Sequence, residues 1–149
     1  MVKGYPCGGP HESAAPRQGR RILVVDDERP VLAFFCAFLE KEGYEVDLVE
    51  DGRAAFRKAT AGTENRSPYD LVSMDLRMPN WDGMDGIVSL GLVEPKLPVI
   101  VVSGYLTEEI IGELKIAPNV VGWLDKPVDL KKYREMVARA VQRPAGSEV

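Results

Sequence analysis

The segment ILVVDDERP, residues 22–30, decides the fold because an apolar run ends there in two carboxylates. Residues 22–25 are rich in β-branched side chains, as buried strands are. Pro30 suits the first turn of a helix, since it lacks a backbone N–H group and its φ angle is already close to the helical value. A strand followed closely by a helix is the repeating unit of an α/β sheet.

The helix that starts at Pro30 is expected to extend to residue 42 and to bury one face. Its apolar residues recur at helical spacing, at Val31, Phe35, Phe38 and Leu39. Gly43 follows as a typical C-terminal cap, because glycine adopts the left-handed conformation easily.

The rest of the chain repeats this alternation. Further strands are predicted at residues 45–49, 71–74, 99–102 and 120–124, and further helices at 53–61, at 83–92, after Thr107 and after Asp129. Residues 45–49 alternate polar and apolar side chains, as at the edge of a sheet, whereas the other strands are largely apolar. The sequence therefore predicts a doubly wound α/β fold, with a five-stranded parallel sheet between five helices.

Composition limits the classes of function. The 149 residues include 45% hydrophobic and 28% charged side chains, which is typical of one soluble domain. The net charge of −4 gives no basic surface for nucleic acid. No apolar run approaches the ~18–20 residues needed to cross a membrane, and the N-terminus lacks the apolar centre of a secretory signal. We therefore expect a cytoplasmic protein without nucleic-acid or membrane partners.

The ends of the chain differ from its centre. Residues 1–19 contain three prolines and four glycines and are predicted to be a disordered leader, and residues 143–149 a short tail. One domain is expected over residues 20–142. Cys36 lies in an apolar run and is predicted to be a buried, reduced thiol, while Cys7 is expected to be exposed. The single histidine, His11, lies in the leader, so no histidine is expected in a folded site.

Polar side chains follow four of the predicted strands. Asp26 and Asp27 follow the first, Asp75 the third, Ser103 ends the fourth, and Lys126 follows the fifth. Because ligands bind at the carboxyl ends of the strands in open α/β sheets, we expect these side chains to share one crevice.

Three carboxylates in one crevice repel each other, and one lysine neutralises them only in part. A hard divalent cation completes the balance, and a site with few carboxylates suits Mg²⁺, which keeps several waters. Asp75 could then act as a nucleophile that forms an acyl phosphate, without a histidine base. The Ser103 hydroxyl could donate to a phosphoryl oxygen.

Four segments together resemble the response-regulator receiver family of two-component signalling. They are VDDE at residues 25–28, MDLRMPNWDG at 74–83, VSG at 102–104 and WLDKP at 123–127. Their order and their places at strand ends make the resemblance specific, and it extends over residues 20–142. It implies a receiver domain there, with the flavodoxin-like strand order 2-1-3-4-5.

The resemblance also implies residue roles. Asp75 would be the phosphoacceptor, and Lys126 and Ser103 would assist its chemistry. The Mg²⁺ ligands would be Asp26, Asp27, Asp75 and the backbone carbonyl of Arg77, and the switch residues Ser103 and Trp123. Trp123 stands where tyrosine or phenylalanine is usual, and Trp81 where methionine is common, so details of the conformational change can differ here. A tryptophan that simply packs in the fifth strand is the alternative interpretation of Trp123.

The main functional hypothesis is a signalling switch. A histidine kinase or phosphotransfer protein would phosphorylate Asp75, and a downstream protein would bind the altered surface of the last two helices. The chain could be a stand-alone regulator, a phosphorelay intermediate, or the receiver of a hybrid histidine kinase. It would catalyse only its own phosphorylation and dephosphorylation.

Two alternatives belong to other classes. An interaction-only pseudo-receiver is disfavoured because no acidic or lysine position of the motif is missing. A phosphatase of the haloacid dehalogenase type is disfavoured because such enzymes have a second carboxylate two residues after the nucleophile, where this chain has Arg77.

Overall fold

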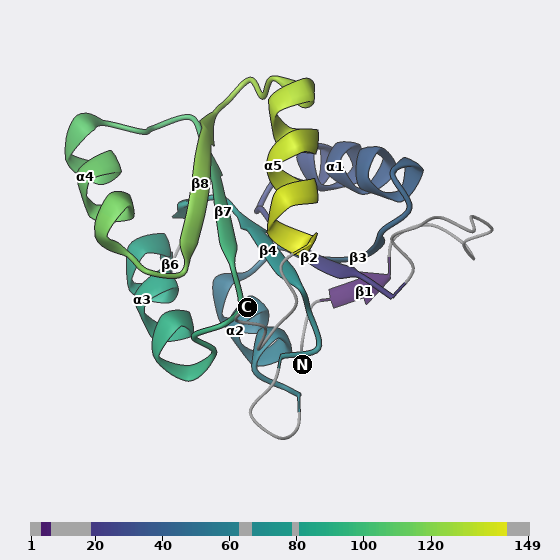
Figure 1. The fold of residues 1–149 in the computed structure, drawn as a ribbon, viewed down its shortest axis with the longest axis horizontal. Helices are drawn as coiled ribbons and strands as arrows, with labels where there is room; N and C mark the ends of the chain where they lie inside the picture. Colours follow the sequence, from purple (N-terminus) through teal and green to yellow (C-terminus); the bar gives the residue numbers. More distant parts are fainter. Residues whose placement is uncertain (1–3, 7–18, 63–66, 79–80, 143–149) are drawn as a thin grey trace.

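The computed structural model describes residues 4–6, 19–62, 67–78 and 81–142, and Figure 1 shows their arrangement. The strands are β1 (Gly4–Pro6), β2 (Arg21–Val25), β3 (Glu45–Val49), β4 (Leu71–Met74), β5 (Arg77–Met78), β6 (Trp81–Asp82), β7 (Val99–Ser103) and β8 (Val120–Asp125). The helices are α1 (Arg29–Lys41), α2 (Gly52–Ala59), α3 (Gly83–Val93), α4 (Glu108–Ile116) and α5 (Leu130–Gln142).

The central sheet has the strand order β1-β3-β2-β4-β7-β8. All neighbours from β3 to β8 pair in parallel. These five strands and the five helices confirm the predicted doubly wound sheet of order 2-1-3-4-5. The short strands β5 and β6 form a separate antiparallel pair directly after β4.

Strand β1 adds an antiparallel edge strand that the sequence did not predict. Gly4, Tyr5 and Pro6 lie opposite Val49, Leu48 and Asp47 of β3. The prediction of a disordered leader therefore does not hold at residues 4–6. A sheet edge offers unpaired backbone groups to any extended segment, so this pairing needs no apolar side-chain pattern. The rest of the leader, with His11, and the tail at 143–149 lie outside the described residues.

The helices cover both faces of the sheet (Figure 1). Helices α1 and α5 pack on one face, where Leu32, Phe35 and Tyr133 contribute to the core. Helices α2, α3 and α4 pack on the other face, where Ile87 and Leu114 contribute. Because apolar cores on both faces fix the sheet, the carboxyl ends of its strands are held at one rigid edge.

Local capping explains where several helices begin and end. The side chains of Asp51, Asp82 and Thr107 accept backbone N–H hydrogen bonds in the first turns of α2, α3 and α4. Gly43 has a positive φ of 97°, as predicted for the residue that ends α1.

Cys36 differs from its predicted state as a reduced thiol. It is buried on α1, as expected, but it is disulfide-bonded. The sequence contains one other cysteine, Cys7, which lies outside the described residues. Burial among apolar neighbours could be inferred from the sequence, whereas a disulfide depends on a spatial approach that two isolated cysteines do not reveal. Among the described residues, no helix has the length and apolar character of a membrane span.

Candidate functional site

Two neighbouring strands bring Asp26 and Asp75 together. Val25, the last residue of β2, lies opposite Met74, the last residue of β4. The next backbone N–H groups continue the ladder, since Asp75 N donates to Val25 O at 3.1 Å. Both side chains are buried, with Asp26 3% and Asp75 8% exposed. Parallel pairing thus places two carboxylates side by side at the strand ends.

Lys126 directly follows β8, the strand at one edge of the sheet, and its side chain extends to the same two carboxylates. Ser103 at the end of β7 lies opposite Asp125 at the end of β8, and Lys126 N donates to Ser103 O at 3.0 Å. The Lys126 ammonium donates to Asp26 Oδ2 at 2.8 Å and to Asp75 Oδ2 at 3.2 Å. It therefore bridges the two carboxylates.

Negative charge exceeds positive charge in this cluster. Carboxylate oxygens of Asp26, Asp27 and Asp75 all lie within 4.8 Å of one another. Among the described residues, Lys126 is the one cation within ion-pair distance of Asp26 or Asp75. Burial raises the pKa of Asp26, although its hydrogen bonds to Lys126 and to Glu28 N–H oppose the shift. Burial alone would lower the pKa of Lys126, but its contacts with Asp26 and Asp75 raise it.

Backbone N–H groups hold the side chains of Asp26 and Asp75 in position. Glu28 N donates to Asp26 Oδ1 at 2.9 Å, and Arg77 N donates to Asp75 Oδ1 at 3.2 Å. Each bond joins a side chain to the backbone two residues later, a short-range turn that aspartate favours. One oxygen of each carboxylate is thereby oriented, while the other faces Lys126.

The donor set suits a hard divalent cation. Three carboxylates within reach of one point provide oxygen ligands, and the excess negative charge favours a cation. The residues therefore fit a divalent metal ion better than they fit a closed salt-bridge cluster, in which each charge would already be matched.

The other predicted site residues lie around this cluster. Ser103 is fully buried, and its Oγ accepts a hydrogen bond from Tyr105 N at 3.2 Å. Trp123 lies on β8 opposite Val101, is partly buried, and packs against the core on the side of α2, α3 and α4. The packed environment of Trp123 agrees with its alternative interpretation as a structural residue and does not test the switch role.

Arg77 and Tyr105 form a stacked pair beside the carboxylates. The Arg77 guanidinium carbon lies 4.0 Å from the centre of the Tyr105 ring, a distance typical of a cation–π contact. Arg77 comes two residues after Asp75, and Tyr105 two residues after Ser103. The side chain of Arg77 is thus engaged with an aromatic ring, rather than pointing freely into solvent.

Trp81 occupies a slot that two glycines create. A Cβ atom at Gly52, the first residue of α2, or at Gly86 of α3 would overlap the indole ring. Trp81 stands where methionine is common, but its place in the sequence does not connect it with these glycines. The available signal was Gly86 itself, because glycine inside a helix is unfavourable and usually has a packing reason.

The family model for the response regulator receiver domain matches residues 22–138. The chemotaxis protein CheY of Treponema pallidum is 31% identical over 123 residues, which cover 82% of this chain and 83% of that protein. By contrast, the chain spans only 27% of the length of several bacterial transcriptional regulatory proteins that it matches at 28–31% identity.

Solved structures agree with this match. A CheY-like receiver domain protein from Methanospirillum hungatei superposes with a TM-score of 0.73 at 26% identity, covering 83% of this chain and 94% of that one. The response regulator protein TrrA from Thermotoga maritima, in complex with Mg(2+)-BeF, superposes with a TM-score of 0.70 at 27% identity. The latter match covers 81% of this chain and 98% of that one.

Proposed function

Because this chain belongs to the response regulator receiver domain family of two-component signalling, we propose that it is switched by Mg²⁺-dependent phosphorylation of Asp75. The observation that carries the proposal is the shared ammonium of Lys126, which contacts Asp26 at 2.8 Å and Asp75 at 3.2 Å. Such a bridge fixes the acceptor carboxylate and leaves the cluster short of positive charge.

The proposed reaction is a phosphoryl transfer to a carboxylate. An oxygen of ionised Asp75 forms a bond to phosphorus, and the bond from phosphorus to the donor breaks, with its electron pair leaving on the donor. The donor is a phosphohistidine of a histidine kinase or phosphotransfer protein. The attacking carboxylate has no proton to lose, so the transfer depends on positioning and charge neutralisation rather than on a base.

The residues around Asp75 have different proposed roles in this transfer. Lys126 is placed to neutralise charge on the phosphoryl oxygens, and the buried Ser103 hydroxyl to donate a hydrogen bond to one of them. Asp26, Asp27, Asp75 and the Arg77 carbonyl would hold Mg²⁺. When bound, this ion would supply the remaining positive charge for the phosphoryl oxygens.

The proposed output is a change in protein contacts. Phosphorylation adds about −1.5 to −2 charge at the site. Ser103 is the last residue of β7, and Lys126 directly follows β8. If these two residues move in response to the added charge, the environment of Trp123 and the surfaces of α4 and α5 change with them. We propose that a downstream protein recognises this change. A stand-alone regulator, a relay intermediate and a hybrid-kinase receiver all remain compatible with such an output.

We further propose that the chain catalyses only its own phosphorylation and dephosphorylation. A phosphatase of the haloacid dehalogenase type has a second carboxylate two residues after the nucleophile, whereas this chain has Arg77 two residues after Asp75. Its guanidinium stacks on Tyr105 and cannot act as a general acid at neutral pH.

Intact-mass measurement after incubation with acetyl phosphate and Mg²⁺ tests the proposal. The wild type should gain the mass of one phosphoryl group, and Asp75→Asn should gain none. Asp82→Asn is a matched control that alters an exposed carboxylate in the same loop region, and it should be phosphorylated like the wild type. If the wild type gains no mass, or if Asp75→Asn gains the same mass, phosphorylation of Asp75 is disproved and an interaction-only role becomes the better interpretation.

A further inference from the structure

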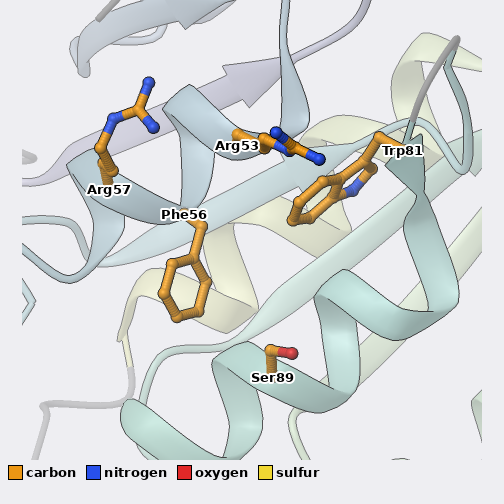
Figure 2. A pocket seen from close by; sticks show the side chains of 5 residues that line it. All are labelled: Arg53, Phe56, Arg57, Trp81 and Ser89. Carbon is orange, nitrogen blue, oxygen red and sulfur yellow. The ribbon is translucent and has the colours of Figure 1, made fainter.

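A surface cavity of about 250 Å³ lies between α2 and α3, on the side of the sheet that these helices cover. It is lined by Arg53, Phe56, Arg57, Trp81 and Ser89, and Figure 2 shows these side chains around it. None of them belongs to the carboxylate cluster or takes part in the proposed phosphoryl transfer. The cavity therefore needs a separate explanation.

The two walls of the groove differ in chemistry. Arg53, Phe56 and Arg57 come from α2 at the spacing i, i+3, i+4, and all three line the cavity. In Figure 2, Arg53 points towards Trp81, whereas the side chains of Phe56 and Arg57 diverge. The same spacing on α3 places Leu92 and Val93 on the face of Ser89, and both are exposed, Leu92 to 81% and Val93 to 51%. The α2 wall is thus basic, and exposed apolar side chains continue the α3 face beyond the lining residue Ser89.

Both arginines are available to a partner. Arg53 and Arg57 are exposed, and neither forms an ion pair with an acidic side chain among the described residues. The chain as a whole has a net charge of −4, so this paired positive charge contrasts with the rest of the protein. Paired cations beside an apolar surface complement an occupant that is both acidic and apolar.

The size and shape of the cavity favour a protein segment over a free small molecule. Small-molecule pockets usually enclose about 300–1,000 Å³ and bury most of the ligand, whereas this cavity is smaller and open to solvent. Its volume suits one large apolar side chain, with Phe56 and Trp81 as apolar contacts. Protein interfaces use such anchor side chains, surrounded by polar contacts, to supply most of their affinity.

We propose that the groove between α2 and α3 is a docking site for an acidic segment of a partner protein, which inserts one aromatic or large aliphatic side chain against Phe56 and Trp81. Carboxylates that flank this anchor pair with Arg53 and Arg57. The apolar residues Leu92 and Val93 extend the contact along α3. Docking does not require phosphorylation of Asp75.

Trp81 provides a local signal for occupancy. Its indole Nε1 is buried and has no hydrogen-bond partner among the described residues. Trp81 itself lines the groove, so an occupant changes the environment of the ring (Figure 2). The indole N–H resonance in an ¹⁵N-correlated NMR spectrum therefore reports binding at this place.

The test is an NMR titration of the full chain with a short acetylated and amidated peptide in which glutamates flank one phenylalanine. Saturable shifts are expected for the Trp81 indole N–H and for the amides of Phe56 and Ser89. Exchanging the peptide's phenylalanine for alanine, or its glutamates for lysines, should abolish these shifts. Absence of saturable shifts at the groove with the first peptide overturns the proposal.

Charge-reversal variants distinguish peptide binding at the groove from non-specific electrostatic attraction. The double variant Arg53→Glu/Arg57→Glu should weaken peptide binding at least about tenfold, because like charges at an interface oppose association. The matched control Lys115→Glu/Arg139→Glu changes net charge equally at exposed positions of α4 and α5, and it should bind like the wild type. Equal weakening in both double variants contradicts the proposal. Leu92→Ser keeps every charge and should weaken binding by removing apolar contact.

Other occupants give different results. If the groove resonances shift with protein concentration in the absence of peptide, the surface is an interface between copies of this chain. If phenylpropionate saturates the site and the peptide does not, the site is one for small organic anions. Either result overturns the proposal. Phosphorylation by acetyl phosphate should be unchanged in Arg53→Glu/Arg57→Glu, so failure of docking and failure of the phosphorylation proposal are distinguishable.

Discussion

The two ends of the parallel strands both gather aspartates and cations, but they balance them differently. At the amino end, Arg21 Nη2 contacts Asp47 Oδ2 at 2.9 Å, and Arg20 lies 3.7 Å from Asp70. The Tyr69 hydroxyl also donates to Asp47. At the carboxyl end, Lys126 forms ion pairs with both Asp26 and Asp75, and Asp27 lies close to them.

The difference distinguishes a cluster whose charges are matched from one that carries an excess of negative charge. At the amino end each partly buried carboxylate has its own arginine, and Asp70 Oδ2 also accepts from Arg21 N–H at 2.8 Å. At the carboxyl end three carboxylates share one lysine, so the cluster gains most from a further cation. Unmatched charge at the strand ends, rather than the presence of aspartates as such, therefore indicates a binding site.

Asp47→Ala should have the largest effect on stability, because it breaks the matched cluster. It leaves the buried Tyr69 hydroxyl and Arg21 without their shared acceptor. The expected loss in the free energy of unfolding is about 2–3 kcal/mol, the scale of an unsatisfied buried donor combined with a lost charged hydrogen bond. Urea unfolding measures it. Glu45→Ala removes the exposed partner of the same arginine and should change stability by less than about 0.5 kcal/mol. Equal effects of both substitutions would contradict a structural role of the cluster.

Mg²⁺ should stabilise the unmatched cluster and leave the matched one unaffected. At ten times its dissociation constant, a ligand specific for the folded state adds about 1.4 kcal/mol. Thermal unfolding with and without Mg²⁺ should show this gain in the wild type. The gain should persist in Glu45→Ala and disappear in Asp26→Asn/Asp27→Asn. A gain of the same size in the Asp26→Asn/Asp27→Asn variant would place the ion elsewhere.

Asp26→Asn should stabilise the metal-free protein, opposite in sign to Asp47→Ala. Burial raises the pKa of Asp26 in the folded state, so folding favours its protonated form. The stabilising contribution is complete below the ordinary aspartate pKa and is lost as the pH rises through the folded-state pKa. The amide is neutral at every pH and has no such loss, although its single acceptor oxygen keeps only one of the two hydrogen bonds, from Lys126 or from Glu28 N–H. A gain of about 0.5–2 kcal/mol at neutral pH, which vanishes below about pH 4, is expected from urea unfolding across that range. A gain that is independent of pH would rule out ionisation as its cause.

Most of the fold could be predicted from the sequence because its signals are local. The β-branched run at residues 22–25, Pro30 and Gly43 mark one strand–helix unit, and the pattern then repeats. Strand β1 could not be predicted, because Gly4–Pro6 pair with β3 through backbone groups that no side-chain pattern encodes. The disulfide of Cys36 could not be predicted either, because the sequence does not show which side chains approach each other in space.

The carboxylate cluster was predictable for a different reason. Parallel pairing puts all strand ends at one edge, so Asp26, Asp75 and Lys126 had to converge once the strands were assigned. The slot for Trp81 was not predictable, because it requires Gly52 and Gly86 from two helices to meet the same ring. The sequence therefore shows which residues lie at the edge of the sheet, whereas the packing of side chains between helices is seen only in the structure.

A smaller loss of stability than that of Asp47→Ala is expected for Tyr105→Leu, and this variant allows the arginine–tyrosine pairs at the two ends to be compared. Arg77 lies 4.0 Å from the Tyr105 ring centre, and Arg21 lies 5.0 Å from that of Tyr69. Tyr105 is 57% exposed, so water screens its contact with Arg77 despite the shorter distance. Losing an exposed cation–π pair costs about 0.5–1 kcal/mol. Tyr69→Leu should cost more, because it also leaves Asp47 without a hydroxyl donor in a partly buried site. Urea unfolding of both variants measures the ranking. The reverse ranking would show that ring proximity outweighs burial, and the amino-end cluster would then not be the structural one.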